Sequence, residues 1–301
     1  MTRNIEVKNN NNILRSRSKA AYIFLLPWAV LFLIFTLYPL VYGIYVSFTD
    51  FTLAGKTFIG LDNYKAIFSD QAFAPSLVAN VFYAAVAIPL TIIISLLVAN
   101  ALIRFGKGFN TFTKLAFYLP GVISSTALVL TWKYLVAPQS GYLIWISNTF
   151  DIPMASLLEN PIASIPIMAV MVAIFNFGQA VILYSAAINS IPVSYYEAAN
   201  IDGATRHQQF FSITIPMLHQ TTLFILVTST IAIMQLFVVP YLITNGGPQN
   251  KSSTVLLMIY KSAFQNGQYG YASAIGILFF ILLSIVAFFQ FKIMKRDTIE
   301  Y

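Results

Sequence analysis

Residues Glu197 to Leu218 read Glu-Ala-Ala-Asn-Ile-Asp-Gly-Ala-Thr-Arg-His-Gln-Gln-Phe-Phe-Ser-Ile-Thr-Ile-Pro-Met-Leu. This segment is an island of polar and small residues between two long apolar runs, 162–191 and 218–243. Irregular backbone is not tolerated where it faces lipid hydrocarbon, so the island must lie outside the bilayer core. The sequence therefore predicts two membrane-spanning helices joined by a loop at one membrane surface, around which the rest of the chain is organised.

The composition of the whole chain agrees with a membrane protein. Of its 301 residues, 58% are hydrophobic and only 9% are charged, and the mean hydropathy is +0.76. Soluble domains have roughly 45–50% apolar and about 25% charged residues. The absence of cysteine excludes disulfides, thiol nucleophiles and cysteine-ligated metals. The two histidines, His207 and His219, make a poor metal site by themselves, so no metal site is expected.

Six apolar runs are each long enough to cross the hydrocarbon as a helix, which takes about 20 residues. The first is too long for the apolar region of a signal peptide, so we expect it to be retained as a span. The predicted fold class is an all-α polytopic membrane protein with six transmembrane helices. Its transmembrane domain covers residues 20–296 between a basic tail, 1–19, and a short tail, 297–301. The runs are 20–48, 77–103, 115–135, 162–191, 218–243 and 271–291.

The distribution of Lys and Arg sets the orientation, because basic residues gather on the cytoplasmic side. An N-terminus inside the cell places twelve of the 17 basic residues there, and both termini and the Glu197 loop then face the cytoplasm. These charges flank apolar runs rather than covering one face, so the net charge of +7 does not indicate nucleic-acid binding. The inner basic residues are Arg3, Lys8, Arg15, Arg17, Lys19, Arg104, Lys107, Lys114, Arg206, Lys292, Lys295 and Arg296.

The loop, 193–217, is expected to hold two short helices joined by a glycine turn. Ser194 is a plausible N-cap for a helix over 193–200, with Glu197 completing a capping box. Gly203 permits a turn with positive φ, and a second helix over 206–213 precedes the fifth span. From the residues alone, a plain polar loop and a docking element for another protein both remain open.

The spacing of the loop resembles the EAA motif of the permease subunits of ABC importers. The pattern is Glu197-Ala198-Ala199, three residues, Gly203, nine residues, Ile213, one residue, and Ile215-Pro216. Further similar segments are Ile191-Pro192, Ile201-Asp202-Gly203-Ala204, Thr244-Asn245-Gly246-Gly247-Pro248, Gly60-Leu61-Asp62-Asn63-Tyr64, Ala263-Phe264 and Tyr271-Ala272-Ser273-Ala274. Together they resemble the carbohydrate-uptake branch, which includes the maltose and glycerol-phosphate permeases. The family usually has Leu at position 215 and often a tryptophan where 174–177 read Ile-Phe-Asn-Phe.

This resemblance implies the type I ABC importer permease fold and a set of partners. These are a second homologous permease, two ATPase subunits that bind ATP and Mg, an extracellular solute-binding protein, a sugar substrate and the lipid bilayer, with no nucleic acid. It places the chain in the cell membrane of a bacterium. Its implied ATPase-coupling residues are Glu197, Ala198, Ala199, Asp202, Gly203, Ala204, Ile213 and Pro216, and its implied binding-protein docking residues are Asn245, Gly246, Gly247 and Pro248.

Two absences from the sequence limit how transport could be driven. The string Gly55-Lys56-Thr57 has Asp50 where a phosphate-binding loop needs its first glycine, so no cofactor and no enzymatic activity are expected in this chain. The span interiors carry no charged residue, which disfavours coupling to an ion gradient. Solute contacts are then expected from uncharged groups in the fourth and fifth spans, where the resemblance also places them: Asn176, Gln179, Ser229, Ile233, Gln235 and Leu236.

The favoured hypothesis is half of the pathway of an ATP-driven sugar importer, with an oligosaccharide suggested by the many aromatic residues. A stand-alone secondary carrier or channel for a small polar solute is the main alternative. A membrane scaffold that recruits a cytoplasmic protein through the loop is another. Transport by the purified chain without ATP would favour the carrier, whereas co-purification with an ATPase would favour the importer.

Overall fold

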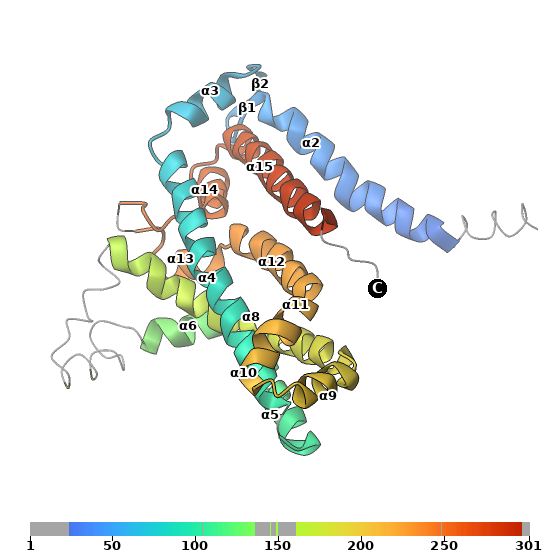
Figure 1. The fold of residues 1–301 in the computed structure, drawn as a ribbon. Coiled ribbons are helices and arrows are strands. Elements are labelled where there is room, and N and C mark those ends of the chain that lie inside the picture. Colours follow the sequence, from blue (N-terminus) through green and yellow to red (C-terminus); the bar gives the residue numbers. More distant parts are fainter. Residues whose placement is uncertain are drawn as a thin grey trace, which may run out of the picture.

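The computed structural model describes residues 24–103, 105–135, 145, 149, 161–247 and 249–296, and the described chain is almost entirely helical (Figure 1). The tails 1–19 and 297–301 lie outside the described residues. Five described helices are long and apolar enough to cross a membrane, namely Phe24–Ser47, Phe73–Leu102, Ala163–Ser190, His219–Ile243 and Tyr269–Ile293. They confirm five of the six predicted spans.

The third predicted span is bent. It consists of α5 (Lys107–Val122) and α6 (Ser125–Leu135), which meet at an angle of 93°. Pro120 lies in the last turn of α5, and Ile123 after it has an extended backbone. A proline cannot donate a helical hydrogen bond and disrupts the turn before it. The six-span prediction is therefore met by five apolar spans and one sharply bent pair, and α5 begins eight residues earlier than the predicted run.

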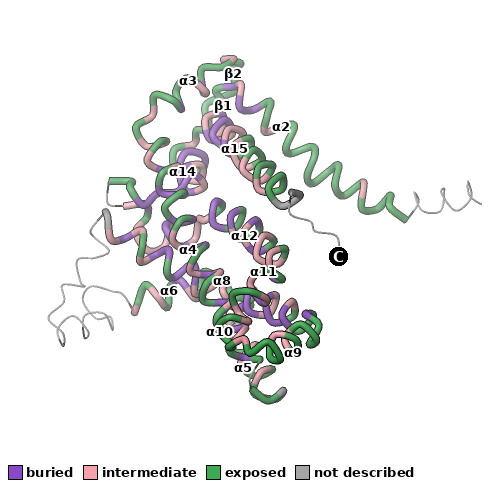
Figure 2. The backbone as a smooth tube through the Cα atoms, viewed as in Figure 1, coloured by how far each residue is buried: buried purple, intermediate pink, exposed green. Residues whose placement is uncertain are grey.

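Helices α4 (Phe73–Leu102) and α8 (Pro161–Ser190) form the centre of the described chain. Small buried residues such as Ala79, Ala87, Ala169 and Ala173 line their contact, which lets the two backbones approach closely. Helices α12 (His219–Met234), α13 (Val238–Ile243) and α15 (Tyr269–Arg296) complete the bundle. Figure 2 shows buried residues along α12 and along α14 (Val255–Tyr260).

The first span stands apart from this bundle. It contains a π-helical turn, η2 (Leu33–Leu37), followed by α2 (Tyr38–Ser47), and it contacts α15 near its outer end (Figure 1). None of its most apolar stretch is buried, and Figure 2 shows it exposed over most of its length. Its apolar surface is therefore available to lipid or to another membrane protein.

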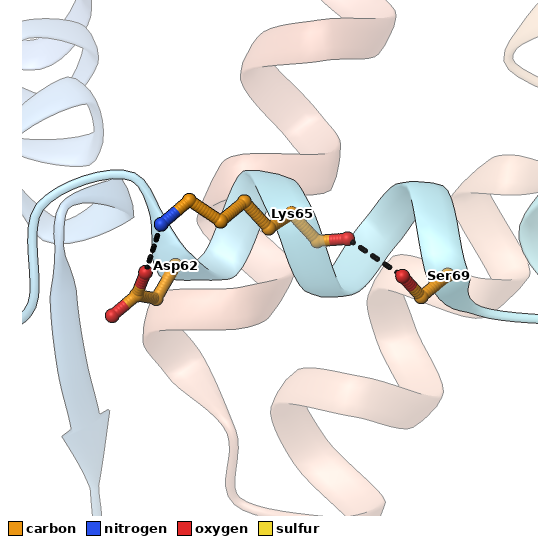
Figure 3. Close-up of polar contacts among 3 residues, drawn as sticks. All are labelled: Asp62, Lys65 and Ser69. Atoms are coloured by element: carbon orange, nitrogen blue, oxygen red, sulfur yellow. Dashed lines mark hydrogen bonds and ion pairs between the residues drawn. The ribbon is translucent and has the colours of Figure 1, made fainter.

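The predicted outer end carries a small hairpin and one short helix. Strands β1 (Thr49–Thr52) and β2 (Gly55–Phe58) pair antiparallel, with Thr49 opposite Phe58. In α3 (Asp62–Ser69), Asn63 donates hydrogen bonds to the carbonyls of Ser47 and Thr49, both at 2.9 Å. Figure 3 shows the exposed ion pair of α3, in which Lys65 Nζ lies 2.8 Å from Asp62 Oδ1. Ser69 Oγ donates to the Lys65 carbonyl at 3.2 Å.

The opposite end is formed by the Glu197 loop. Its helices are α9 (Val193–Ile201) and α10 (Arg206–Gln209), followed by a π-helical turn, η3 (Phe210–Thr214), and α11 (Ile215–Met217). Figure 1 shows α9 and α10 at the far end of the molecule from β1, β2 and α3. The remaining connection, between α13 and α15, contains α14 and the π-helical turn η4 (Lys261–Gln265).

Candidate functional site

Helix α9 begins differently from the prediction. Its N-cap is Pro192, and no side chain caps it. Ser194 is therefore the second helical residue and cannot act as the N-cap, so the predicted capping box with Glu197 is wrong. The capping box lies instead at the second helix, where Thr205 N donates to Gln208 Oε1 at 2.7 Å and Gln208 N donates to Thr205 Oγ1 at 3.4 Å.

The glycine turn is confirmed. Gly203 has φ +73°, a conformation that costs side-chain-bearing residues free energy. The Gly203 amide donates to the Asn200 carbonyl and the Ala204 amide to the Ala199 carbonyl, which together close the C-terminus of α9. Asp202 lies in this turn as the C-cap.

Side-chain hydrogen bonds join the two loop helices into one unit. Gln209 Nε2 donates to Asn200 Oδ1 at 2.7 Å and to the Ala204 carbonyl at 3.2 Å. The Tyr196 hydroxyl lies 2.9 Å from Thr214 Oγ1, which links α9 to η3. These hydrogen bonds tie α9 to the residues that lead into α12.

The exposed face of the loop contains most of the predicted coupling residues. Glu197, Ala198, Asp202, Gly203 and Pro216 are exposed. The half-buried members of the predicted set are Ala199, Ala204 and Ile213.

The sequence reasoning missed two large apolar residues on this face. Val193 and Ile201 are 67% and 87% exposed, four residues on either side of Glu197, so all three lie on one side of α9. Their exposure in a polar loop is the signal that could have identified them. A partner surface that covers α9 would bury this apolar pair together with the Glu197 carboxylate.

Two neighbouring cavities lie where the fourth and fifth spans meet. One has a volume of about 80 Å³ and brings together Asn176, Gln179 and Ser229. The other has a volume of about 290 Å³ and is lined by Asn176, Gln235 and Leu236 together with the bend between α5 and α6. Asn176 and Ala232 border both cavities, so five of the six predicted solute contacts line these two adjoining cavities.

Ile233 is the predicted contact that lines neither cavity. Its side chain is only 2% exposed and belongs to the central apolar core. The predicted face assumed that one straight helix runs from Ser229 to Leu236, but α12 ends at Met234. The break turns Gln235 and Leu236 toward the larger cavity, while Ile233 stays in the core.

The walls of these cavities are uncharged and partly aromatic. Asn176 donates to the Val172 carbonyl of its own helix at 2.7 Å. Phe175 and Phe237 line the larger cavity, and Trp132 of α6 meets Phe175 edge-on with ring centroids 6.3 Å apart. The region thus offers amides and ring faces to a polar, uncharged ligand.

The break in the fifth span is held by residues that the sequence reasoning did not identify. The buried Asn80 of α4 donates to the Met234 carbonyl at 2.8 Å and accepts the Val255 amide at 2.9 Å. Thr254 Oγ1 donates to the Leu236 carbonyl at 2.6 Å. These side chains satisfy carbonyls that the interrupted helix leaves without partners. A buried Asn in an apolar run was the available signal.

The predicted docking segment after the fifth span mostly shapes its own loop. Gly246 is buried with φ +81°, and a Cβ there would lie 3.1 Å from Ser253 Cβ. Asn245 is exposed, and its carbonyl accepts a 2.7 Å hydrogen bond from Lys261 Nζ, whose pKa is lowered by burial. Gly247 accepts from Ser252 at 2.6 Å. Pro248 lies outside the described residues.

Most of the chain is similar to known membrane transport proteins. Residues 73–300 match the family described as "Binding-protein-dependent transport system inner membrane component". The "Probable ABC transporter permease protein YurN" of Bacillus subtilis strain 168 is 32% identical, over 93% of this chain and 97% of its own length. The "Multiple sugar-binding transport system permease protein MsmF" of Streptococcus mutans serotype c is 30% identical, over 91% of this chain and 95% of its own.

Among solved structures, a chain of the bacterial alginate ABC transporter, crystallised with an alginate pentasaccharide-bound periplasmic protein, has the same architecture. It superposes with a TM-score of 0.81 at 24% identity and covers 94% of this chain and 96% of its own. This likeness concerns the fold, and it confirms the predicted all-α, type I permease architecture.

Proposed function

Since the chain belongs to the family of binding-protein-dependent transport system inner membrane components, we propose that it forms half of the translocation pathway of an ATP-driven sugar importer. It is a multi-pass inner-membrane protein. The observation that carries the proposal is the direct connection between the exposed α9 face and the two helices, α8 and α12, that border the uncharged cavities.

The loop is suited to receive movement from a cytoplasmic ATPase. Gly203 and the Gln209 and Tyr196 hydrogen bonds make α9, α10 and η3 one unit. This unit lies between α8 and α12 in the chain, so an ATPase that pulls on Glu197, Ala198 and their neighbours would move both helices together. Two ATPase subunits, binding ATP and Mg, and a second homologous permease would complete the machine, and this chain would hydrolyse no ATP.

The cavities favour a neutral carbohydrate. Asn176, Gln179, Ser229 and Gln235 can exchange hydrogen bonds with hydroxyl groups, and no charged side chain lines either cavity within the described residues. Aromatic faces such as Phe175 suit the C–H faces of sugar rings. We propose an oligosaccharide, delivered by an extracellular binding protein that docks near Asn245.

Replacing Gly203 tests the coupling step. Gly203→Val should abolish sugar uptake while leaving ATP hydrolysis, because a β-branched residue strongly disfavours positive φ. Gly203→Asn is the matched control, since Asn tolerates this conformation. Glu197→Lys should also uncouple, because it reverses the charge at the centre of the exposed face. The measurements are radiolabelled sugar uptake and ATP hydrolysis in proteoliposomes that contain the chain with its co-expressed partner subunits.

Full uptake in both Gly203→Val and Glu197→Lys would contradict coupling through this loop. Uptake by the purified chain alone, without ATP or partners, would instead identify a stand-alone carrier or channel and would overturn the proposal.

A further inference from the structure

Four aromatic rings contact one another around α13 and the end of α14. The rings of Phe237 and Tyr241 are stacked, with centroids 5.1 Å apart and planes at 14°. Tyr260 contacts both of them, at 5.0 and 5.2 Å, and Phe264 of η4 lies 5.4 Å from Tyr260. These four residues form one continuous aromatic array.

The inner end of the aromatic array lies at the proposed solute site. Phe237 lines the cavity of about 290 Å³, together with Gln235 and Leu236. Each of the other three rings is joined to Phe237 directly or through Tyr260. The array therefore extends the wall of this cavity.

The other end of the array lies at the predicted outer end of the molecule. Three residues after Phe264, a Cβ on Gly267 would lie 3.4 Å from Leu53 Cδ1, in the turn between β1 and β2. Lys261, the first residue of η4, donates to the carbonyl of Asn245 in the predicted docking segment. Figure 1 shows α14 between α13 and this hairpin. The array therefore connects the surroundings of the docking segment to the cavity.

The array packs differently from its neighbours in the chain. Leu236, Val238 and Ile259 pack against the central apolar core. Within the described residues, no ring of the array belongs to either apolar core cluster or packs against it. Three of the rings are half-buried, and Phe264 is 72% exposed. Core packing therefore does not account for the array, and its rings keep surface that a ligand can reach.

The array has the chemistry of a surface that binds sugars. The faces of aromatic rings carry partial negative charge, so they attract the weakly positive C–H groups on the face of a sugar ring. The hydroxyls of Tyr241 and Tyr260 can also exchange hydrogen bonds with sugar hydroxyls. A benzene ring and a sugar ring are similar in width, so a row of aromatic rings can contact several linked sugar units.

We propose that the aromatic array is the outer part of the solute site, and that it binds the units of an oligosaccharide that extend beyond the cavity. This inference rests on the proposed function of sugar import. One end of the chain occupies the cavity at Phe237, while the following units lie on the rings toward Phe264. The transporter therefore selects oligosaccharides over single sugars.

The test uses the assembled transporter in proteoliposomes, with saturating binding protein and a panel of radiolabelled neutral glycans from single sugars to pentasaccharides. We expect the wild-type transporter to take up oligosaccharides. Phe264→Leu should lower uptake of the longest transported glycan about fivefold, the order expected for one aromatic contact, because leucine offers no ring face. ATP hydrolysis stimulated by the binding protein should keep its wild-type rate.

Three further variants serve as comparisons. Phe68→Leu is the matched control and should not lower uptake, since Phe68 is 75% exposed on α3 at the same predicted end but outside the array. Tyr260→Leu should lower uptake as Phe264→Leu does, at a second position. Phe264→Trp keeps a ring face and should restore most of the uptake that Phe264→Leu loses.

The possible outcomes separate this inference from the proposed function. Uptake by Phe264→Leu and Tyr260→Leu equal to that of Phe68→Leu would overturn the inference. A parallel fall in stimulated ATP hydrolysis would also overturn it, because Phe264 would then contact the binding protein. Uptake of single sugars alone by the wild-type transporter would overturn it and leave the proposed function intact. If the wild-type transporter takes up no glycan of the panel with ATP, both are wrong.

Hydroxyl-radical footprinting measures the contact directly. The assembled transporter is trapped with a non-hydrolysable ATP analogue and binding protein, either sugar-free or loaded with the longest transported glycan. The glycan should protect Tyr260 and Phe264 from oxidation and leave Phe68 unchanged. Equal oxidation of Tyr260 and Phe264 in the two samples would mean that the sugar does not touch the array, and the inference would be wrong.

Discussion

Single residues set how closely the helices of this protein approach one another. Gly178 of α8 is buried where α5 crosses, and a Cβ there would overlap the carbonyl oxygen of Phe117. The obstacle is backbone rather than a flexible side chain, so it cannot move without shifting the whole of α5. The crossing that positions the bent third span beside the cavities therefore depends on the absence of one methyl group.

Gly178→Ala should destabilise the protein, because overpacking at a tight contact typically costs about 1–3 kcal/mol. Gly43→Ala in α2 is the matched control, since nothing lies within 4 Å of the added Cβ. The measurement is the midpoint of thermal unfolding in detergent, which should fall in Gly178→Ala and remain unchanged in Gly43→Ala. Equal midpoints in the two variants would contradict the close crossing.

Asn80 has a comparable role through hydrogen bonds. Asn80→Ala removes a donor to Met234 and an acceptor for Val255, and leaves buried backbone groups without partners, at a cost of about 1–3 kcal/mol for each unsatisfied group. We expect a clear loss of thermal stability, and increased amide hydrogen exchange at Val255. Asn266→Ala, at an exposed position of the outer loop, should leave both quantities unchanged. If Asn80→Ala unfolds at the wild-type temperature, the side chain does not hold the break.

At the scale of elements, the loop shows how local signals can be assigned to the wrong helix. Ser194 and Glu197 have the spacing of a capping box, but Pro192 begins α9 and leaves Ser194 inside it. Thr205 and Gln208 have the same spacing and do form the box. The difference depends on where each helix starts, which is set by Pro192 and by the positive φ of Gly203 rather than by the capping residues themselves.

Thr205→Ala should therefore weaken the start of α10 by about 1 kcal/mol, the usual cost of losing an N-cap. Amide hydrogen exchange at Gln208 and Gln209 should become faster by roughly fivefold, which is the factor that corresponds to this free energy. Ser194→Ala is the comparison, and it should leave exchange in α9 unchanged. Faster exchange in α9 of the Ser194→Ala variant would mean that Ser194 caps this helix, which would contradict Pro192 as its N-cap.

For the molecule as a whole, the sequence was sufficient to predict the class of fold and the number of apolar runs. Charge-free runs such as 77–103 can be accommodated only by lipid and by other apolar helices. Their assignment as membrane spans therefore does not depend on the details of tertiary packing. The glycine turn at Gly203 and the grouping of Asn176 with Gln179 were also predictable, because each follows from a residue type or a short helical spacing.

The features that could not be predicted depend on contacts between distant segments. The 93° bend after Pro120 and the end of α12 at Met234 reflect neighbours on α8, α4 and α14. A proline or a glutamine in an apolar run is compatible with a straight helix as well. Ile233 therefore lies in the apolar core rather than beside the other predicted contacts. The hydrogen bonds of Asn80 and Thr254 join segments that are far apart in the sequence, so sequence spacing does not predict them.

The break between α12 and α13 also gives the fifth span a mechanical property. Asn80 and Thr254 hold the backbone at this joint through hydrogen bonds. From the joint, α12 extends for 16 residues, about 24 Å, and the Glu197 loop lies at its other end. Ser229 lies only about 8 Å from the joint. If α12 pivots about this joint, a displacement of the loop is reduced roughly threefold at Ser229, because the two lie about 24 Å and about 8 Å from the joint.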